Sequence, residues 1–421
     1  MAGLPFLPLA ASFCLLHKKY RGQFVARIGL HLPRLDKQTP KIWIHAMSLG
    51  EYNAARPLIK ALSLAIPDAT IIVSASTRSG LDALRKDSLN QKHITLALPY
   101  DLFFITQKFV NRLCPSCFLL IETDLWPALL WDLHREGCKI LLANGSISSK
   151  SAKRLQKIPK LAQFLYRPFT KLCMQSHDDA DRLIRLGIDL VKIEILGNLK
   201  SDIIPPNLTK QMQQQLMEAT GFLPSNTIIC AGSTHEPEEK ILLEAFLLLK
   251  KGHNDLRMIL APRDVRRGKK IEELCSQLGL TYKSRSRGSK RANTNPDIYI
   301  LDTLGELQRF YAICHLAFVG GSLAPVGGHN LLEPVHLGKP VIFGPHVESC
   351  QEVAKTLMEE NAGFMVKDQV TLEKTIERLL PPSSNYKAAK KATKHFSQSI
   401  RGVTNRYVEI VKALLHNNDN L

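Results

Sequence analysis

The chain has 421 residues, of which 45% are hydrophobic and 22% are charged, so it is globular and too long for one compact core. Its 56 Lys and Arg residues outnumber 38 Asp and Glu residues, and the formal net charge of +18 favours anionic surfaces or phosphorylated ligands. The basic residues are spread along the chain and aromatic residues make up only 7%, which argues against a nucleic-acid partner.

The first 21 residues contain an apolar run, 4–16, that is shorter than the ~20 residues of a membrane-spanning helix. Lys18, Lys19 and Arg21 follow it, whereas a signal peptide carries its positive charges before the apolar run. We therefore expect segment 1–21 to enter a membrane interface, with the basic side chains at the lipid head groups. A packed or disordered terminus is the alternative.

Short apolar runs alternate with amphipathic stretches from residue 41 onward. The runs predict buried strands, and the segments between them are long enough for crossover helices. The same pattern begins again after Pro205 and Pro206, which mark a linker. The predicted strands are 42–46, 70–74, 94–98, 117–121 and 139–142 before the linker, and 227–231, 257–261, 297–301, 316–319 and 340–343 after it. The pattern predicts an α/β protein with two doubly wound parallel sheets.

Two segments of the second half differ from this pattern. Residues 283–296 are basic and rich in turn-forming residues, which predicts a mobile loop rather than a helix or strand. Residues 403–415 predict a final helix, and a return of this helix to the first half of the chain is one possibility.

The nine cysteines are an odd number spread through the predicted strands and helices, which is typical of reduced thiols in a cytosolic protein. Cys114 and Cys117 have the spacing of a metal-binding or redox pair. No second pair follows, and Cys117 begins an apolar run, so a buried strand end is the favoured interpretation.

Residues 318–334 contain the most informative motif of the chain. An apolar strand ends in Gly320 and Gly321, a second glycine pair follows, and Asn330 and Glu333 lie three residues apart. Glycines at the carboxyl end of a strand let the backbone approach a phosphate, and the N–H groups of the next helix face the anion. Asn330 and Glu333 share a face of the first helical turn, where a carboxylate accepts hydrogen bonds from ribose hydroxyls. The segment predicts a nucleotide site, and the alternative is a tight turn without a ligand.

Three charged residues follow predicted strands, at the edge where parallel sheets bind ligands. Glu51 and Glu122 each precede a predicted helix, and Arg263 follows the strand 257–261. An acid in this position can also be a helix N-terminal charge that the helix dipole stabilises. An arginine offers a bidentate, permanently charged fork for a phosphate group.

Seven motifs in this order resemble those of one family, the 3-deoxy-D-manno-octulosonic acid (Kdo) transferases of lipopolysaccharide synthesis. They are 43–51 (WIHAMSLGE), 122–127 (ETDLWP), 197–200 (GNLK), 232–235 (GSTH), 261–263 (APR), 302–307 (DTLGEL) and the glycine segment 318–334. The resemblance covers most of the chain and implies the GT-B fold, in which two Rossmann-like domains face each other across a cleft. It implies a membrane-associated segment 1–21, an acceptor-binding domain 22–204, a linker 205–226, a nucleotide-sugar-binding domain 227–395 and a C-terminal helix 396–421.

The resemblance also implies a reaction. An inverting glycosyltransferase at the cytoplasmic face of the inner membrane would move Kdo from CMP-Kdo to the lipid A precursor (lipid IVA). CMP-Kdo is then a substrate, and no separate cofactor is implied. No Asp-x-Asp pair follows a strand and no His/Asp cluster has the spacing of metal ligands, so we expect no requirement for a divalent cation.

The family's catalytic residues match three positions of this chain. Glu51 matches the general base, which takes the proton of the acceptor hydroxyl, and Glu122 and Lys200 match residues that stabilise the transition state. An exposed lysine without a catalytic role is the alternative for Lys200. Residues matching the nucleotide contacts are Pro262, Arg263, Leu304, Gly305, Glu306, Asn330, Leu331, Leu332 and Glu333, and possible donor contacts are Ser233, His235, Gly327 and Gly328.

The chain departs from the family pattern at three places. The apolar run in segment 1–21 is shorter than the N-terminal anchor that the family usually carries. Asp264 stands where the family usually has His after the Arg, and Asn144, Gly145 and Ser146 stand where it has Asn-Ala-Arg. Two other functions stay open at this point. One is a transferase or epimerase of the same fold that uses another nucleotide sugar, and the other is a non-catalytic module that binds anionic lipid.

Overall fold

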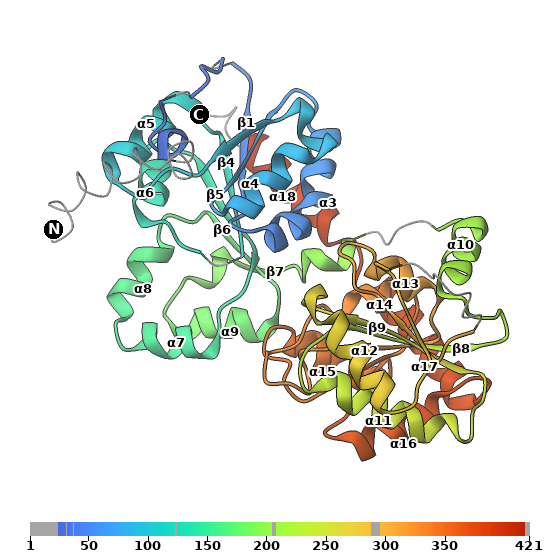
Figure 1. Cartoon of the computed structure of the whole chain (residues 1–421). Helices are drawn as coiled ribbons and strands as arrows, with labels where there is room; N and C mark the ends of the chain where they lie inside the picture. Colours follow the sequence, from blue (N-terminus) through green and yellow to red (C-terminus); the bar gives the residue numbers. More distant parts are fainter. Residues whose placement is uncertain are drawn as a thin grey trace, which may run out of the picture. The chain divides into compact units, whose positions relative to one another are not determined.

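The computed structural model describes residues 24–30, 32–36, 38–122, 124–203, 208–287 and 295–416. These residues form two α/β units (Figure 1). The first unit contains the described residues up to Ile203 together with those from Gly402 onward, and the second contains those in between. The chain therefore crosses between the units twice, and its last helix belongs to the first unit. Segment 1–21, predicted to enter a membrane interface, lies outside the described residues.

The first unit is built on a parallel sheet of seven described strands. They are β1 (Lys41–His45), β2 (Thr70–Ala75), β3 (Ile94–Ala97), β4 (Cys117–Ile121), β5 (Lys139–Gly145), β6 (Lys171–Met174) and β7 (Ile193–Ile195). Their order in the sheet is β3-β2-β1-β4-β5-β6-β7, with β1 paired in parallel with both β2 and β4. This is the doubly wound arrangement that the sequence predicted.

Side chains of these strands alternate between two cores. Ile42 and Ile44 of β1 belong to one hydrophobic cluster, and Trp43 between them belongs to the other. Successive side chains of a strand point to opposite faces, so both faces of the sheet are buried under helices. This burial explains why the strands appear in the sequence as continuous apolar runs rather than as alternating patterns.

The second unit is also built on a parallel sheet of seven described strands. They are β8 (Thr227–Thr234), β9 (Leu256–Pro262), β10 (Tyr282–Ser284), β11 (Ile298–Ile300), β12 (Leu316–Val319), β13 (Val341–Phe343) and β14 (Gly363–Met365). Their order is β10-β11-β9-β8-β12-β13-β14. Successive side chains of β8 again point to opposite faces of the sheet. Ile229 and Ala231 lie in one hydrophobic cluster, and Ile228 and Cys230 lie in another.

Helices connect the strands and cover both sheets (Figure 1). In the first unit they are α3 (Leu49–Ala65), α4 (Arg78–Lys86), α5 (Phe103–Leu113), α6 (Pro127–Arg135), α7 (Ser149–Gln156), α8 (Pro159–Tyr166), α9 (His177–Arg185) and α18 (Val403–His416). In the second they are α10 (Lys210–Thr220), α11 (Glu238–Lys250), α12 (Gly268–Gln277), α13 (Leu307–Ile313), α14 (Leu332–His336), α15 (Gln351–Glu359), α16 (Gln369–Leu379) and α17 (Ser384–Ser399).

The final helix α18 packs on α3 in the first unit, where Val403, Tyr407 and Val411 join the buried cluster beneath β1. Asp202, in the short 3₁₀ helix η4 (Leu199–Asp202), accepts hydrogen bonds from the backbone N–H groups of Gly402 (2.7 Å) and Thr404 (2.5 Å). The segment where the chain leaves the first unit is thereby tied to the segment where it returns.

Two expectations about local structure were wrong. The basic segment 283–296 was predicted as a loop, but β10 (Tyr282–Ser284) extends into it, because its residues pair with β11. The segment 205–226 was predicted as a linker, but helix α10 lies within it and packs on α13. Residues 288–294 and 204–207 are outside the described part of the chain.

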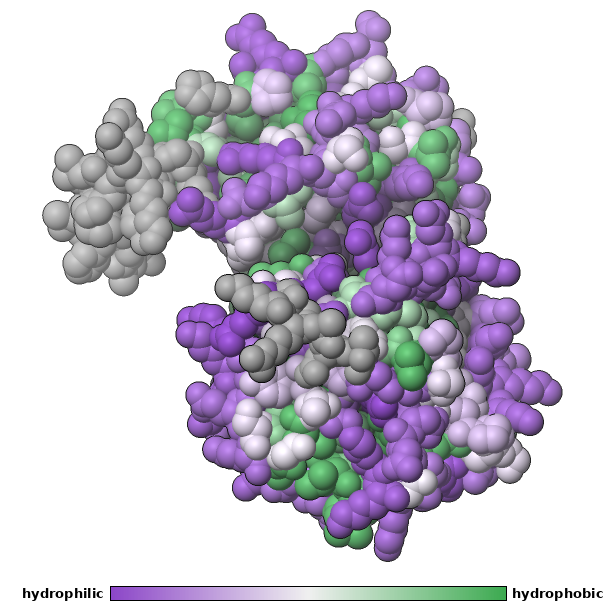
Figure 2. Space-filling model, turned by 45° about the vertical axis from the view of Figure 1, so that its right-hand side comes forward, coloured by the Kyte–Doolittle hydropathy of each residue, from purple (hydrophilic) through white to green (hydrophobic). Residues whose placement is uncertain are grey.

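The described cysteines are free thiols, and Cys117 is the buried first residue of β4, as predicted. None of the described helices is both long and apolar enough to cross a membrane. Figure 2 shows one face of the molecule, on which hydrophilic residues predominate and hydrophobic residues form small separate areas. Isolated apolar residues of this kind are normal at protein surfaces.

Candidate active site

Each sheet has a topological switch point, at which the chain leaves two neighbouring strands in opposite directions. It lies between β1 and β4 in the first sheet and between β8 and β12 in the second. Ligands of parallel α/β sheets bind outside the carboxyl ends of the strands at such points. Glu51 and Glu122 follow β1 and β4, and His235 and Gly320 follow β8 and β12. Residues predicted from the sequence thus lie at both switch points.

Glu51 lies in the first turn of α3 and is only 7% exposed. Its Oε2 accepts a hydrogen bond from the backbone N–H of Met47 (2.7 Å), and its Oε1 accepts one from the Ser48 hydroxyl (3.1 Å). Ser48 is the N-cap of α3, and its Oγ accepts from the N–H of Glu51 (3.4 Å). This reciprocal cap fixes the carboxylate at the carboxyl end of β1.

The pKa of Glu51 is raised to about 7, mainly by burial. The negative charges of Glu122 and Asp124 act in the same direction, and the two hydrogen bonds to the carboxylate act against it. A carboxyl group with a pKa near the working pH both accepts and releases protons readily, which is what a general base requires. Glu51 can therefore take part in the cap of α3 and also act as a base.

Glu122 follows β4 in a left-handed backbone conformation (φ +65°) that residues other than glycine rarely adopt. Its N–H donates to the carbonyl oxygen of Ala143 (2.9 Å), and its carboxylate pairs with Nζ of Lys200 at 3.5 Å. Both side chains are about one third exposed or less, at 27% and 35%. Left-handed residues of this kind cost roughly 1–3 kcal/mol and concentrate at functional sites. The structure therefore brings two of the three predicted catalytic residues into contact.

The position of Lys200 depends on Asn144, which lies near the end of β5 with φ +56°. Asn144 Oδ1 accepts a hydrogen bond from the backbone N–H of Leu199 (2.8 Å), the residue before Lys200. The N–H of Asn144 donates to the hydroxyl oxygen of Tyr407 in α18 (2.7 Å), and this hydroxyl donates to the carbonyl oxygen of Cys173 (3.3 Å). The last helix and the end of β5 thus hold the turn that carries Lys200.

In the second unit, Pro262 ends β9 and Arg263 follows with an exposed side chain. The N–H of Arg263 donates to the carbonyl oxygen of Thr234 (3.0 Å), which places Arg263 beside the end of β8. Asp264, which stands where the family has His, accepts hydrogen bonds from the backbone N–H (3.1 Å) and the guanidinium (2.7 Å) of Arg266. The Asp264 carboxylate therefore stabilises the turn between Asp264 and Arg266.

Leu304, Gly305 and Glu306 form a turn before α13. Leu304 is 78% exposed and Gly305 has φ +82°. The carboxylate of Glu306 accepts hydrogen bonds from the guanidinium of Arg285 (2.7 Å) and the hydroxyl of Thr303 (2.5 Å). The Arg285 hydrogen bond lowers the pKa of Glu306, against some desolvation. The turn is therefore held in one conformation by side chains.

Asn330 and Glu333 contact each other, but Asn330 precedes α14, so the two residues do not share its first turn as predicted. Asn330 Oδ1 caps the N–H of Leu332 (3.1 Å), and its Nδ2 donates to Glu333 Oε1 (3.5 Å). Leu331 and Leu332 are buried against the sheet, which fixes this turn. Burial raises the pKa of Glu333, while hydrogen bonds from Asn330 and Gln308 and the positive charge of Arg263 oppose the rise.

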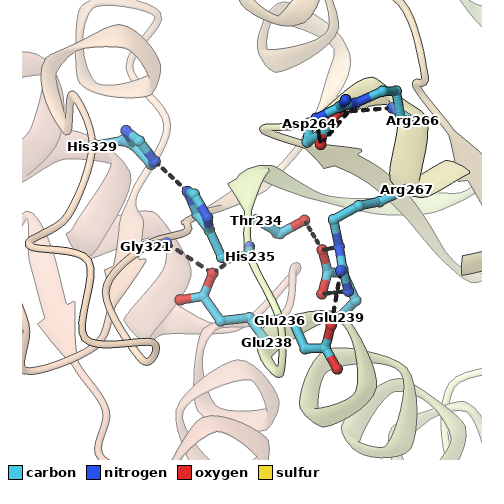
Figure 3. A network of polar contacts seen from close by, with 10 residues as sticks. All are labelled: Thr234, His235, Glu236, Glu238, Glu239, Asp264, Arg266, Arg267, Gly321 and His329. Carbon is cyan, nitrogen blue, oxygen red and sulfur yellow. Dashed lines mark hydrogen bonds and ion pairs between the residues drawn. The ribbon is translucent and has the colours of Figure 1, made fainter. Parts of the chain in front are cut away.

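The glycine segment differs from the prediction in one respect. The glycines were expected to let the backbone approach a phosphate, with the N–H groups of the next helix facing the anion. The N–H groups of residues 321–324, which precede that helix, instead donate to the carboxylate of Glu238 at 2.8–3.2 Å. Figure 3 shows Glu238 pointing at Gly321 from below His235. Glu238 is fully buried and also accepts the N–H of His235 (2.9 Å). These four N–H groups are thus occupied by an anion of the protein itself, and the binding of a phosphate elsewhere on this segment stays a prediction.

The other predicted donor contacts lie in this loop and at the end of β8. Ser233 has φ +56°, and Gly327 and Gly328 have φ +104° and +78°. Gly328 donates its N–H to the carbonyl oxygen of Gly321 (2.7 Å), which closes the loop between the two glycine pairs. His235 contacts His329, with the two Nε2 atoms 2.8 Å apart.

Three functional candidates were missed in the sequence. Glu238 resembled an ordinary acid in the first turn of a helix, and Arg285 was one of many basic residues in segment 283–296. His329 lies inside the glycine segment, where a signal was present: a histidine directly after a glycine pair at the predicted nucleotide site. Within the described ranges, no three His, Cys, Asp or Glu side chains are grouped so that they would hold a metal ion.

Comparison with known proteins identifies the family. The model of the 3-deoxy-D-manno-octulosonic-acid transferase N-terminal region matches residues 22–203. The 3-deoxy-D-manno-octulosonic acid transferase of Rickettsia felis is 31% identical over 379 residues, which is 89% of this chain and 79% of that protein. The chain belongs to the 3-deoxy-D-manno-octulosonic acid transferase family.

Another relative of this chain is a bifunctional glycosyltransferase/methyltransferase of Fusobacterium nucleatum, which is 33% identical over 82% of this chain. The chain spans about half (53%) of the length of that relative. The crystal structure of a glycosyltransferase from Rickettsia africae matches 90% of this chain and all of that chain, with a TM-score of 0.62 and 16% identity. The two units of this Kdo transferase family member therefore have the GT-B fold.

Proposed function

We propose that this protein is an inverting transferase that moves Kdo from CMP-Kdo to the lipid A precursor lipid IVA at the cytoplasmic face of the inner membrane. The observation that carries the proposal is Glu51, a buried carboxyl group with a pKa of about 7 at the switch point of the first sheet. Membership of the Kdo transferase family supports Kdo transfer as the reaction that this group serves.

The proposed chemistry uses the three residues of the first unit. Glu51 takes the proton of the acceptor hydroxyl as its oxygen bonds to the anomeric carbon. The carboxylate of Glu122 stabilises the positive charge that develops at this carbon as the bond to the phosphate breaks. Lys200 neutralises the carboxylate of Kdo or the departing CMP. Attack on the face opposite to the leaving group inverts the anomeric configuration.

The proposed donor contacts lie in the second unit. Arg263 supplies a permanent positive charge and a bidentate fork for the phosphate of CMP. Asn330 and Glu333 offer an amide and a carboxyl group to the ribose hydroxyls. The phosphodiester of CMP-Kdo carries one negative charge and gains a second as CMP leaves, and positively charged side chains can neutralise both. We therefore propose that no divalent cation takes part.

The test is a transfer assay with the purified full-length chain, CMP-Kdo and lipid IVA, with mass spectrometry of the product and NMR of the new anomeric centre. We expect Kdo-bearing lipid of inverted configuration, and the same rate after treatment with EDTA. Transfer from UDP-sugars but not from CMP-Kdo would favour the transferase or epimerase of another sugar. Lipid binding without turnover of any donor would favour the non-catalytic module.

Asn144 gives a prediction about Lys200. Asn144→Ala removes the acceptor for the Leu199 N–H and should lower kcat by about 10- to 100-fold, since small misplacements of a catalytic group have effects of this size. The double variant with Lys200→Ala should be no slower than Lys200→Ala alone, because Asn144 acts through Lys200. Asn361→Ala is the matched control, since Asn361 also has a left-handed backbone (φ +55°) but lies in the second unit. Additive losses in the double variant would contradict this dependence.

An exposed apolar surface on α5, α6 and α8 supports membrane contact. Phe104 (65% exposed) belongs to α5, and Phe164 (49% exposed) of α8 stacks on Trp131 of α6 at 4.9 Å. The guanidinium of Arg135 lies 5.0 Å above the ring of Phe103, and that of Arg167 lies 6.0 Å from Trp131. Aromatic and basic side chains together suit an interface of acyl chains and anionic head groups.

We expect the double variant Phe104→Asp/Phe164→Asp to lose most of its co-sedimentation with vesicles that contain anionic lipid. The two substitutions replace apolar contact area with negative charge at the surface defined above. Leu248→Asp is the matched control, because Leu248 is 45% exposed but belongs to α11 in the second unit. Equal co-sedimentation of the double variant and the control would exclude this surface from membrane binding.

A further inference from the structure

His235 and His329 form a stacked pair in the second unit (Figure 3). Their ring centroids are 5.1 Å apart with an angle of 12° between the planes, and their Nε2 atoms share a hydrogen bond of 2.8 Å. His235 follows β8 and His329 belongs to the glycine segment after β12, so the pair bridges the two strands of the switch point. Both side chains are partly exposed and within reach of a ligand.

Gly321 makes room for this pair. A Cβ atom at Gly321 would lie 3.0 Å from the ring of His329 and 3.5 Å from that of His235. The glycine is also left-handed (φ +68°), so both its conformation and its surroundings disfavour a side chain. The loop is therefore shaped to hold two imidazole rings at the carboxyl edge of the sheet.

Five backbone N–H groups next to the histidine pair are not available to an anionic ligand. The N–H groups of residues 321–324 and of His235 already donate to the buried carboxylate of Glu238. Side chains can contact an anion at this edge, and His235 and Arg263 are the positively charged or protonatable groups that act on His329.

The electrostatic environment of the pair is set by groups on three elements. Burial lowers the pKa of His329 to about 4, and the charge of Arg263 and the charge that His235 carries when protonated act in the same direction. The carboxylate of Glu238 on α11 opposes the shift. His329 is thus neutral near pH 7 in the free protein, and a negative charge placed beside it would raise its pKa.

We propose that His235 and His329, together with Arg263, form a clasp for one anionic group of the donor substrate, the phosphate or the sugar carboxylate. The identity of the donor rests on the proposed function, whereas the binding of an anion by the clasp does not. The clasp adds His329 to the donor site and gives His235 a defined partner and role.

The clasp couples anion binding to proton uptake. When both rings are neutral, only one of the two Nε2 atoms carries the proton of the shared hydrogen bond. An anion that approaches both rings favours protonation of the second Nε2. The hydrogen bond between the rings is then replaced by two N–H groups that donate to the anion. Up to one proton enters from solvent for each anion bound.

The first experiment compares the binding of CMP and cytidine to the full-length protein and to His329→Gln, which keeps a polar side chain but cannot be protonated. If the clasp holds the phosphate, His329→Gln should weaken CMP binding about tenfold to a hundredfold and leave cytidine binding unchanged. If it holds the carboxylate, CMP binding should be unchanged and the KM for CMP-Kdo should rise by a similar factor. His253→Gln, at an exposed histidine of the same unit, is the control.

The second experiment measures proton uptake on anion binding and the protonation of the two histidines. Calorimetry of CMP binding near pH 7.5 in buffers of different ionisation enthalpy should show proton uptake by the wild type that His329→Gln lacks. NMR of ¹⁵N-labelled histidine, assigned with His235→Asn and His329→Gln, should show both Nε2 resonances moving toward the protonated position on titration with inorganic phosphate. The phosphate titration also tests the clasp in a protein that fails to bind CMP, an outcome that would reject only the proposed donor.

Three results would overturn the clasp. One is equal weakening of CMP and cytidine binding by His329→Gln, which would mean a purely structural role. Another is unchanged CMP affinity together with an unchanged KM for CMP-Kdo. The third is the absence of any Nε2 shift with both inorganic phosphate and CMP.

Discussion

Glu51→Gln is expected to reduce Kdo transfer by about 10²- to 10⁴-fold, the usual effect of losing a general base. The binding of CMP should stay close to that of the wild type, because the proposed nucleotide contacts belong to the second unit. Kinetic assays with CMP-Kdo and lipid IVA measure the first effect, and calorimetry with CMP measures the second.

The substitution is well suited to the site. The amide oxygen of a glutamine at position 51 can accept the hydrogen bond from the Met47 N–H, and its amide nitrogen can donate to the Ser48 hydroxyl. The cap of α3 is thus preserved, and only the ability to take a proton is lost. Retention of most of the activity by Glu51→Gln would remove Glu51 from the mechanism.

The pH dependence of kcat/KM of the wild type should also show whether Glu51 is the general base. Glu51 acts as a base only when ionised, and its pKa is about 7, so kcat/KM should rise as the pH increases through about 7. The hydrogen bond from Ser48 lowers this pKa, so Ser48→Ala should move the rise to higher pH. A pH profile with the same midpoint in Ser48→Ala and the wild type would argue against Glu51 as the titrating group.

Most of the fold could be predicted because both sheets are parallel and covered on both faces. Strands of such sheets appear as continuous apolar runs, and 117–121 and 316–319 were predicted with the bounds that the structure has. Strands β6, β7, β10 and β14 were not predicted. Strands β7, β10 and β14 have three residues each and lie at sheet edges, and β6 has only four residues, so the apolar signal of each is short.

The sequence predicts which strand ends form the site. It does not predict which side chains contact each other there. The proximity of Glu51 and Glu122 follows from the order of β1 and β4, which the doubly wound pattern implies. The pairing of Glu122 with Lys200 depends on Asn144 and on helix α18, which is more than 200 residues further along the chain. No local pattern in the sequence contains that information.

The glycine segment shows what a sequence motif alone does not predict. A glycine-rich turn after a strand predicts an anion at its N–H groups, and this holds, but the anion is the carboxylate of Glu238. Glu238 lies more than 80 residues before the segment, in the first turn of α11. Whether a loop of this kind binds an external or an internal anion is decided by tertiary packing.

Removal of this internal anion should have a large effect on stability. Glu238→Ala leaves five backbone N–H groups without their acceptor, in a region where Glu238 itself is fully buried. An unsatisfied buried donor costs about 1–3 kcal/mol, so even with partial relaxation the second unit should lose roughly 3–5 kcal/mol. Urea unfolding of the full-length protein, followed through the transition of the second unit, measures this loss.

Glu238→Gln should fall between the wild type and Glu238→Ala. Its amide oxygen can replace Oε1, which accepts from Ser322, Leu323 and Ala324. Its amide nitrogen would then stand in the place of Oε2, facing the N–H groups of His235 and Gly321, so that donors oppose donors. Amide hydrogen exchange should consequently become faster at Gly321 than at Leu323.

Glu244→Gln is the matched control, because Glu244 lies on the same helix and pairs only loosely with Lys240 (3.8 Å). Unfolding midpoints of both Glu238 variants equal to that of the control would show that the glycine loop is held by something other than this carboxylate.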